Sequence, residues 1–150
     1  MLYDTLVFVH VLAAIVWVGG GIASQVVTAR LAKADPAHRL GAARDFLFIG
    51  TRIYPWASLI VLITGVSMVL DEAVLDFEQA WIVIGLIGLV ATAGIGSGYI
   101  TPQSRKAIAA VEAGNPAAAA PIGARIALAS RTAAVLLLVA LWAMVFKPGL

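Results

Sequence analysis

Four long apolar segments, separated by polar and charged stretches, dominate the pattern of this chain. They cover residues 5–28, 54–70, 81–100 and 126–146. A helix needs about 20 apolar residues to cross a bilayer, at a rise of ~1.5 Å per residue, and each segment is close to that length. The pattern therefore predicts a single transmembrane domain, residues 1–150, built as an all-α antiparallel bundle of four transmembrane helices.

Composition agrees with this pattern and removes several classes of function. The chain is 62% hydrophobic and 12% charged, and a soluble domain carries about twice that share of charge. The absence of cysteine excludes disulfides and thiolate ligands. The sequence contains no serine–histidine–acid set, no paired intramembrane carboxylates and no phosphate loop, so it does not support a hydrolase, an ATP-driven pump or a nucleic-acid partner. Whether the protein is an enzyme stays open.

The charged residues predict an orientation. Only Lys147 lies on the side of the acidic loop at 71–78, and the other nine basic residues follow the first and third spans. Cytoplasmic loops carry an excess of Lys and Arg, which predicts that both termini lie outside. The nine residues are Arg30, Lys33, Arg39, Arg44, Arg52, Arg105, Lys106, Arg125 and Arg131.

The two basic linkers carry different signals. Asp35-Pro36 is typical of a helix start, with Asp as the N-cap and Pro in the first turn. We expect a short interfacial helix from about residue 36 to 48 in the first cytoplasmic linker. Thr101-Pro102 is predicted to end the third span, with a basic, Ala-rich linker from there to about Arg125.

The first span carries its polar and small residues on one face. Residues seven apart on a helix nearly eclipse one another, so this stripe is expected to face protein, while Leu6, Phe8, Val11, Ile15, Val18 and Ile22 lie on other faces. The stripe of the first span consists of Tyr3, Val7, His10, Ala14, Trp17, Gly21, Ser24 and Thr28.

The third span has a comparable small-residue ridge for close helix packing, at Gly85, Gly88, Ala91, Gly94 and Gly98.

His10 is the candidate functional residue. An ionisable side chain within a membrane is costly to bury and is a functional hypothesis by default. Imidazole is a common ligand of haem iron and other metals, and Trp17 with the triplet Gly19-Gly20-Gly21 would suit a flat cofactor between helices. Three interpretations stay open: a haem or metal ligand, a structural hydrogen bond across helices and a proton carrier.

Two methionines extend the metal interpretation. Met68 and Met144 are predicted at a depth similar to that of His10, and thioethers favour copper(I). His10, Met68 and Met144 could therefore bind copper(I), and Met68 could instead be a second axial ligand of haem. Methionine more often fills irregular gaps in a core, so a purely structural or interaction subunit of a membrane complex is the remaining alternative.

The first span also resembles known families. His10-Val-Leu-Ala-Ala-Ile-Val-Trp17-Val-Gly19-Gly20 resembles the signature of a bacterial family of small four-helix integral membrane proteins of unknown function. Arg52-Ile-Tyr-Pro55, Thr64-Gly65 and Thr101-Pro102 are similar to later elements of that family. The spacing from histidine to tryptophan is also similar to that in the membrane domain of copper-resistance proteins and in the four-helix protoporphyrinogen oxidase.

The resemblance implies a site and a location, but not a reaction. In the oxidase the first-span histidine is understood to bind haem, which implies b-type haem on His10, with Trp17 and Gly20 as its packing surround. The chain lacks an intramembrane lysine and a second intramembrane histidine to match the oxidase. It also lacks the methionine- or histidine-rich parts of the copper-resistance group. The implied location is a bacterial inner membrane, with lipids, a second copy or other membrane subunits as partners.

Overall fold

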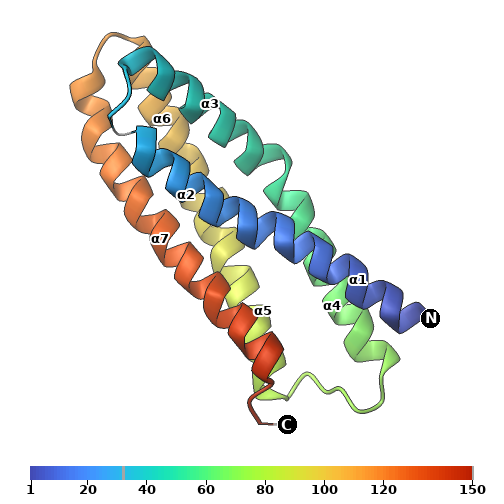
Figure 1. The fold of residues 1–150 in the computed structure, drawn as a ribbon. Coiled ribbons are helices and arrows are strands. Elements are labelled where there is room, and N and C mark those ends of the chain that lie inside the picture. The colour runs from blue at the N-terminus through green and yellow to red at the C-terminus, as the bar shows by residue number, and fades with distance from the viewer. Residues whose placement is uncertain (32, 150) are drawn as a thin grey trace.

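Nine helical segments make up four long rods in the computed structural model, which describes residues 1–31 and 33–149 (Figure 1). The described residues contain no strand, and each rod is long and apolar enough to cross a membrane. The prediction of an all-α protein with four transmembrane helices is therefore confirmed. The segments are α1 (Leu2–Ala14), the π-helical η1 (Ile15–Gly19), α2 (Gly20–Leu31), α3 (Pro36–Arg52), α4 (Tyr54–Asp71), α5 (Ala80–Gly94), the π-helical η2 (Ile95–Ile100), α6 (Thr101–Glu112) and α7 (Pro116–Phe146).

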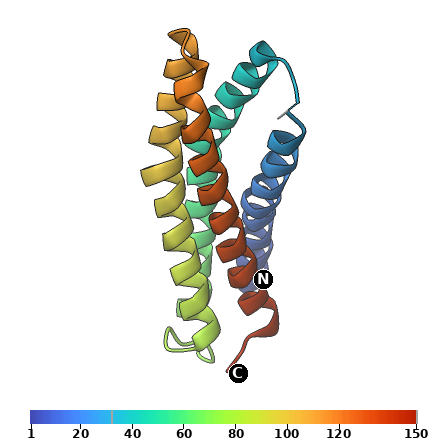
Figure 2. The same ribbon diagram turned by 90° about the vertical axis from the view of Figure 1, so that its left-hand side faces the viewer.

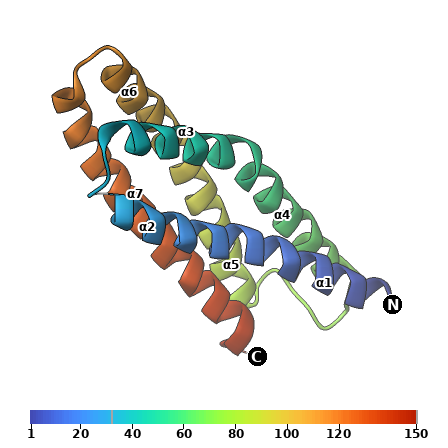
Figure 3. The same cartoon turned by 45° about the horizontal axis from the view of Figure 1, so that its top comes forward.

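The rods run antiparallel and pack as two hairpins. Both termini and the α4–α5 loop lie at one end, here the termini end, and the α2–α3 and α6–α7 connections lie at the other, the turn end (Figures 1 and 2). The most extensive packing joins α1 to α4 and α5 to α7 (Figure 3). Among the described residues, α1 has no close backbone contact with α5 or α7. Near the termini end the two hairpins therefore meet mainly where α4 touches α5.

The α5–α7 hairpin is held by apolar packing around glycine. Trp81, Ile82 and Ala143 are buried together, and Met144 packs against them. A Cβ on Gly85 would collide with the methyl of Met144, and one on Gly88 would lie 2.9 Å from the Ala140 Cβ. The ridge prediction is confirmed at these two glycines, because only a missing side chain allows α5 and α7 to approach so closely.

The ridge prediction is wrong farther along the third rod. A Cβ on Gly94 or Gly98 would have no described atom within 4 Å outside its own backbone surroundings. These glycines lie at the end of α5 and in η2. A π-turn has more residues than an α-turn, so a three-and-four spacing does not keep Gly98, which lies within η2, on the face of Gly85 and Gly88.

The polar stripe of the first rod does face protein. Trp17 is buried, and Tyr3, Val7, His10, Ala14, Gly21 and Ser24 are half-buried, so only Thr28 of the stripe is exposed. Phe8, Val11, Ile15 and Ile22 are exposed, as expected for faces turned toward lipid. Leu6 and Val18 are half-buried and depart from the prediction.

The expected linker after the third span is mostly helix, which corrects the prediction. The chain continues through Pro102 into α6, and α7 begins at Pro116 and runs through Pro121. A proline ring clashes with the carbonyl four residues earlier in a regular α-helix, but the residue four before Pro102 is Gly98, which lies within the wider turns of η2. The real break is short: Gly114 has a φ of 77°, and the Asn115 side chain accepts from the Ala118 N–H at 3.2 Å.

The start of α3 is as predicted. Asp35 caps the helix by accepting from the His38 backbone N–H at 2.9 Å, and Pro36 occupies the first turn. That hydrogen bond lowers the pKa of Asp35 from its usual value. The helix is longer than the expected 36–48, because it ends at Arg52. An Arg44–Glu112 ion pair at 2.6 Å joins it to α6. Its interfacial position, like the orientation of the termini, stays a prediction.

We expect Gly88→Leu to destabilise the protein by about 1–3 kcal/mol, because the new side chain forces α5 and α7 apart. Gly94→Leu is the matched control, since a Cβ there meets open space. The free energy of unfolding would be measured in detergent by the loss of helical circular dichroism with added denaturing detergent. Equal losses in the two variants would contradict close packing at Gly88.

Candidate functional site

A hydrogen bond between His10 and Thr64 joins the first two rods. His10 lies on α1 and Thr64 on α4, each about two turns from the termini end of its helix. The His10 Nδ1 is 3.0 Å from the Thr64 Oγ1. Thr64 is buried and His10 is half-buried. The ionisable group of the first span therefore has a specific polar partner across the helix interface.

The surroundings of Thr64 decide which atom donates this bond. The Thr64 Oγ1 is 2.6 Å from the Ile60 carbonyl oxygen in its own helix, so the hydroxyl proton is donated there. A hydroxyl has one proton to donate and lone pairs to accept. The bond to His10 is therefore donated by the imidazole Nδ1–H. A neutral imidazole with its proton on Nδ1 carries its free lone pair on Nε2.

Gly65 leaves room for the imidazole. A Cβ at this position would lie 3.3 Å from the His10 Cε1 and 3.6 Å from its Nδ1. Contacts of that length are tight, so a larger side chain would press the ring away from Thr64. Thr64 and Gly65 thus act together, one as the hydrogen-bond acceptor and the other as the space that lets the ring reach it.

A second polar contact joins the same two rods nearer the turn end. The Ser24 Oγ donates to the Gly20 carbonyl at 2.8 Å, so the Tyr54 hydroxyl donates to the Ser24 Oγ at 3.2 Å. A Cβ on Gly20 would lie 2.9 Å from the Tyr54 hydroxyl oxygen. Gly20, proposed from the sequence as a cofactor surround, lies beneath the Tyr54 side chain.

Trp17 lies in η1, between these two contacts along the chain, and is 8% exposed. The η1 segment contacts both α4 and α7. Among the described residues, η1 has close backbone contacts with α7, whereas α1 has none with the second hairpin. Trp17 therefore lies where the first rod begins to approach the second hairpin. Its burial agrees with the expectation that this tryptophan is packed within protein or faces a ligand.

The two methionines lie in different places. The Met144 methyl lies against Gly85, within the α5–α7 hairpin, whereas His10 belongs to the α1–α4 hairpin. Met68 is half-buried on α4, one turn from Thr64 and on the same side of the helix. The described contacts therefore place Met68 on the side of α4 that carries Thr64, and they place Met144 in the packing of the other hairpin. Within the described ranges there is no cluster of three or more His, Asp or Glu side chains able to hold a metal.

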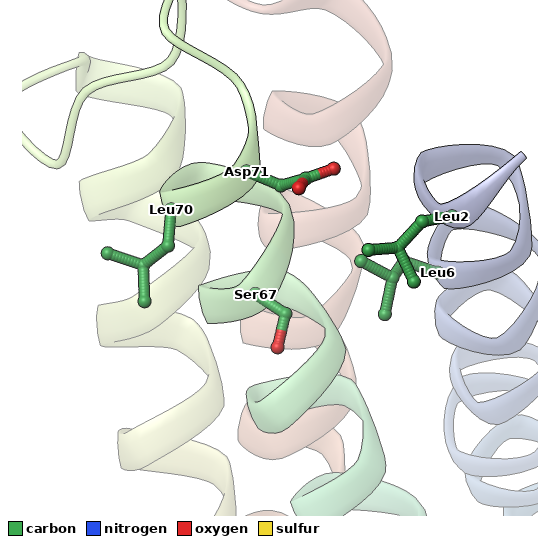
Figure 4. Close-up of a pocket in the computed structure, with 5 residues that line it drawn as sticks. All are labelled: Leu2, Leu6, Ser67, Leu70 and Asp71. Carbon is green, nitrogen blue, oxygen red and sulfur yellow. The ribbon is translucent and has the colours of Figure 1, made fainter.

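A hollow of about 330 Å³ opens between α1 and α4 at the termini end (Figure 4). Leu6 precedes His10 by one turn, and Ser67 follows Thr64 by about one turn. The Asp71 carboxylate is directed from the end of α4 toward Leu2 and Leu6 (Figure 4). The hollow is lined by Leu2, Leu6, Ser67, Leu70 and Asp71. Its lining is partly polar and partly apolar, and its nearest residues lie about one helical turn from His10 and Thr64.

Sequence reasoning found His10 but not its partner. Thr64 and Gly65 entered only as part of a family resemblance. A signal was present: in antiparallel spans, residues at equal depth from the same end can meet, and His10 and Thr64 lie at equal depth. A threonine followed by glycine at that depth is a suitable partner for a buried imidazole.

Comparison with known proteins gives one match. A family model described as "Predicted integral membrane protein (DUF2269)" matches residues 4–148. No curated protein and no solved structure matches this chain.

The proton assignment can be tested by nitrogen NMR on protein labelled with ¹⁵N-histidine. We expect His10 to show a protonated Nδ1 and an unprotonated Nε2, because Thr64 can only accept. Thr64→Val should remove this preference, while exposed His38 serves as an internal reference. Thr92→Val is the matched control, since the Thr92 hydroxyl is also buried and donates to a carbonyl of its own helix, at 2.6 Å. A His10 proton on Nε2 in the unmodified protein would overturn the assignment.

Proposed function

Since this chain belongs to the DUF2269 family of predicted integral membrane proteins, we propose that it acts within the bilayer by binding b-type haem through His10, for electron transfer or haem handling. One observation supports this proposal above all. The His10 Nδ1 is held by Thr64, which leaves the Nε2 lone pair for a metal. Histidines that ligate metals almost always donate their other ring N–H to a fixed acceptor, which sets the tautomer and the ring orientation.

The neighbouring residues have definite roles in this proposal. Thr64 orients the imidazole, and Gly65 leaves the space in which it is oriented. Leu2 and Leu6 line the hollow on the termini side of His10 and present apolar surface there, as a porphyrin face requires. Trp17 and Gly20 continue the same side of the first rod toward its middle. Haem bound there would supply one-electron chemistry at its iron.

The proposal also includes two candidates for a second ligand of the iron. Met68 shares the Thr64 side of α4 and is the methionine on the His10 hairpin, so it is the candidate within one chain. A His10 from a second copy of the chain is the other candidate. The copper(I) alternative uses the same Nε2, but it requires Met144 to leave its contact with Gly85.

The same hydrogen bond supports a second candidate function, in which His10 is structural. An imidazole that joins two helices through a threonine stabilises their association without any cofactor, and such bonds are worth about 1–2 kcal/mol in model peptides. In that case the protein would be a structural or interaction subunit of a membrane complex. The two functions differ in whether Nε2 has a ligand.

An absorption spectrum of the detergent-purified protein, produced with an ample supply of haem, tests the proposal. We expect a Soret band with sharp α and β bands on reduction, and their loss in His10→Ala. Thr64→Val should weaken haem binding by about 10- to 100-fold, as loss of such a supporting residue typically does. His38→Ala and Thr92→Val should leave the spectrum and the affinity unchanged.

The opposite result is equally clear. If the unmodified protein is colourless, retains its helical circular dichroism and does not respond to added hemin, the haem proposal fails. If in addition His10→Ala and Thr64→Val lower the free energy of unfolding by similar amounts, the structural function is favoured. Titration with copper(I), with Met144→Leu as a comparison, then tests the remaining alternative.

A further inference from the structure

A second hollow lies on the other hairpin, far from His10 and near the turn end. It has a volume of about 290 Å³ and lies between η2 and α7. On α7 its lining residues recur at positions three and four apart, which places them on one helix face. The hollow is lined by Ile95, Tyr99, Arg125, Leu128, Ala129 and Thr132.

The polar and apolar lining residues are separated along the bundle axis. Arg125 lies roughly 32 Å from the termini end of α7, counted from Phe146, and Tyr99 roughly 28 Å from the start of α5, at ~1.5 Å per residue. With the boundary on the termini side placed at Phe146 and Ala80, a hydrocarbon core about 30 Å thick ends near both residues at the turn end. Ile95, Leu128 and Thr132 lie deeper, toward the middle of the membrane.

The end of the groove that contains Arg125 and Tyr99 is positively charged and has no acidic partner among the described residues. The ion pairs among the described residues are Met1–Asp4 and Arg44–Glu112, so the Arg125 guanidinium has no carboxylate there. Tyr99 is 39% exposed and its hydroxyl makes no hydrogen bond to a described residue. The deeper wall offers no free donor, because the Thr132 hydroxyl donates to the Leu128 carbonyl at 3.2 Å.

We propose that this groove between η2 and α7 binds one anionic phospholipid, with its phosphate at Arg125 and Tyr99 and an acyl chain along Ile95, Leu128 and Ala129. A guanidinium and a phenol at the boundary match a phosphate, and an apolar wall leading toward the midplane matches an acyl chain. A free phosphate ion would use only the first part, so it leaves the apolar wall unexplained. The groove shares no residue with the His10 site, and the two proposals stand independently.

The surroundings favour an anionic lipid over a neutral one. The turn end also carries Arg30, Arg105 and Lys106, and basic residues beside a membrane attract anionic headgroups. The Gln25 side chain donates to the Ser130 carbonyl at 3.4 Å, so the first hairpin contacts α7 at the residue next to Ala129. A lipid in the groove would therefore lie beside a contact between the two hairpins.

Native mass spectrometry of the full chain in neutral detergent tests this proposal. Phosphatidylglycerol and phosphatidylcholine with identical acyl chains would be titrated separately. We expect one phosphatidylglycerol to be retained at concentrations where phosphatidylcholine is not. Arg125→Gln should weaken that binding by about fivefold, the value of one basic residue near an anionic surface. Arg131→Gln is the matched control, since Arg131 is exposed on the same helix and does not line the groove.

Three results would overturn the proposal, provided that circular dichroism shows each variant to be folded. The first is equal retention of the two lipids. The second is an equal effect of Arg125→Gln and Arg131→Gln, which would mean general electrostatic attraction. The third is displacement of the lipid by millimolar inorganic phosphate, which would assign the groove to a free anion. A third variant, Leu128→Ser, should weaken binding through the acyl wall, and an unchanged affinity would likewise count against the proposal.

Discussion

The bilayer offers no water to a polar hydrogen, so each hydroxyl within a span must find its acceptor in the protein. In this chain the Ser24, Thr64 and Thr92 hydroxyls all donate to a carbonyl one turn back in their own helix. Their oxygens are then left only as acceptors. A partner on another helix must bring the proton, and both Tyr54 and His10 do so. The tautomer of His10 is a consequence of this constraint.

The two hairpins meet the same requirement for association in different ways. The α5–α7 hairpin removes side chains, so that Gly85 and Gly88 admit Met144 and Ala140. The α1–α4 hairpin instead joins polar groups, and uses glycines at 20 and 65 to let Tyr54 and His10 reach their acceptors. Glycine thus serves packing in one hairpin and hydrogen bonding in the other, which is why the candidate chemistry gathers in the first.

Local patterns predicted what depends on local physics. The four spans, the Asp35 cap and the protein-facing stripe around Trp17 follow from hydropathy and helical periodicity, and the structure has them. The helical course through Pro102 was not predictable from the proline rule, because it depends on the π-turns before it. The Thr64 partner of His10 depends on how deep two separate spans sit relative to each other. That relation can be inferred from the sequence only if the depths of His10 and Thr64 are both counted from the same end of the bundle.

The division into two hairpins also bears on motion. Toward the turn end the hairpins are joined where α3 approaches α6 and α2 approaches α7, and the Arg44–Glu112 ion pair and the Gln25–Ser130 hydrogen bond belong to these contacts. By contrast, α1 has no close backbone contact with the second hairpin within the described residues. Rigid-body closure and opening between packed units is a common form of conformational change. Here such a rocking movement would change the spacing of the hairpins near the termini while the imidazole and its threonine travel together as one body. A movement of that kind would leave the distance between the His10 Nδ1 and the Thr64 Oγ1 unchanged.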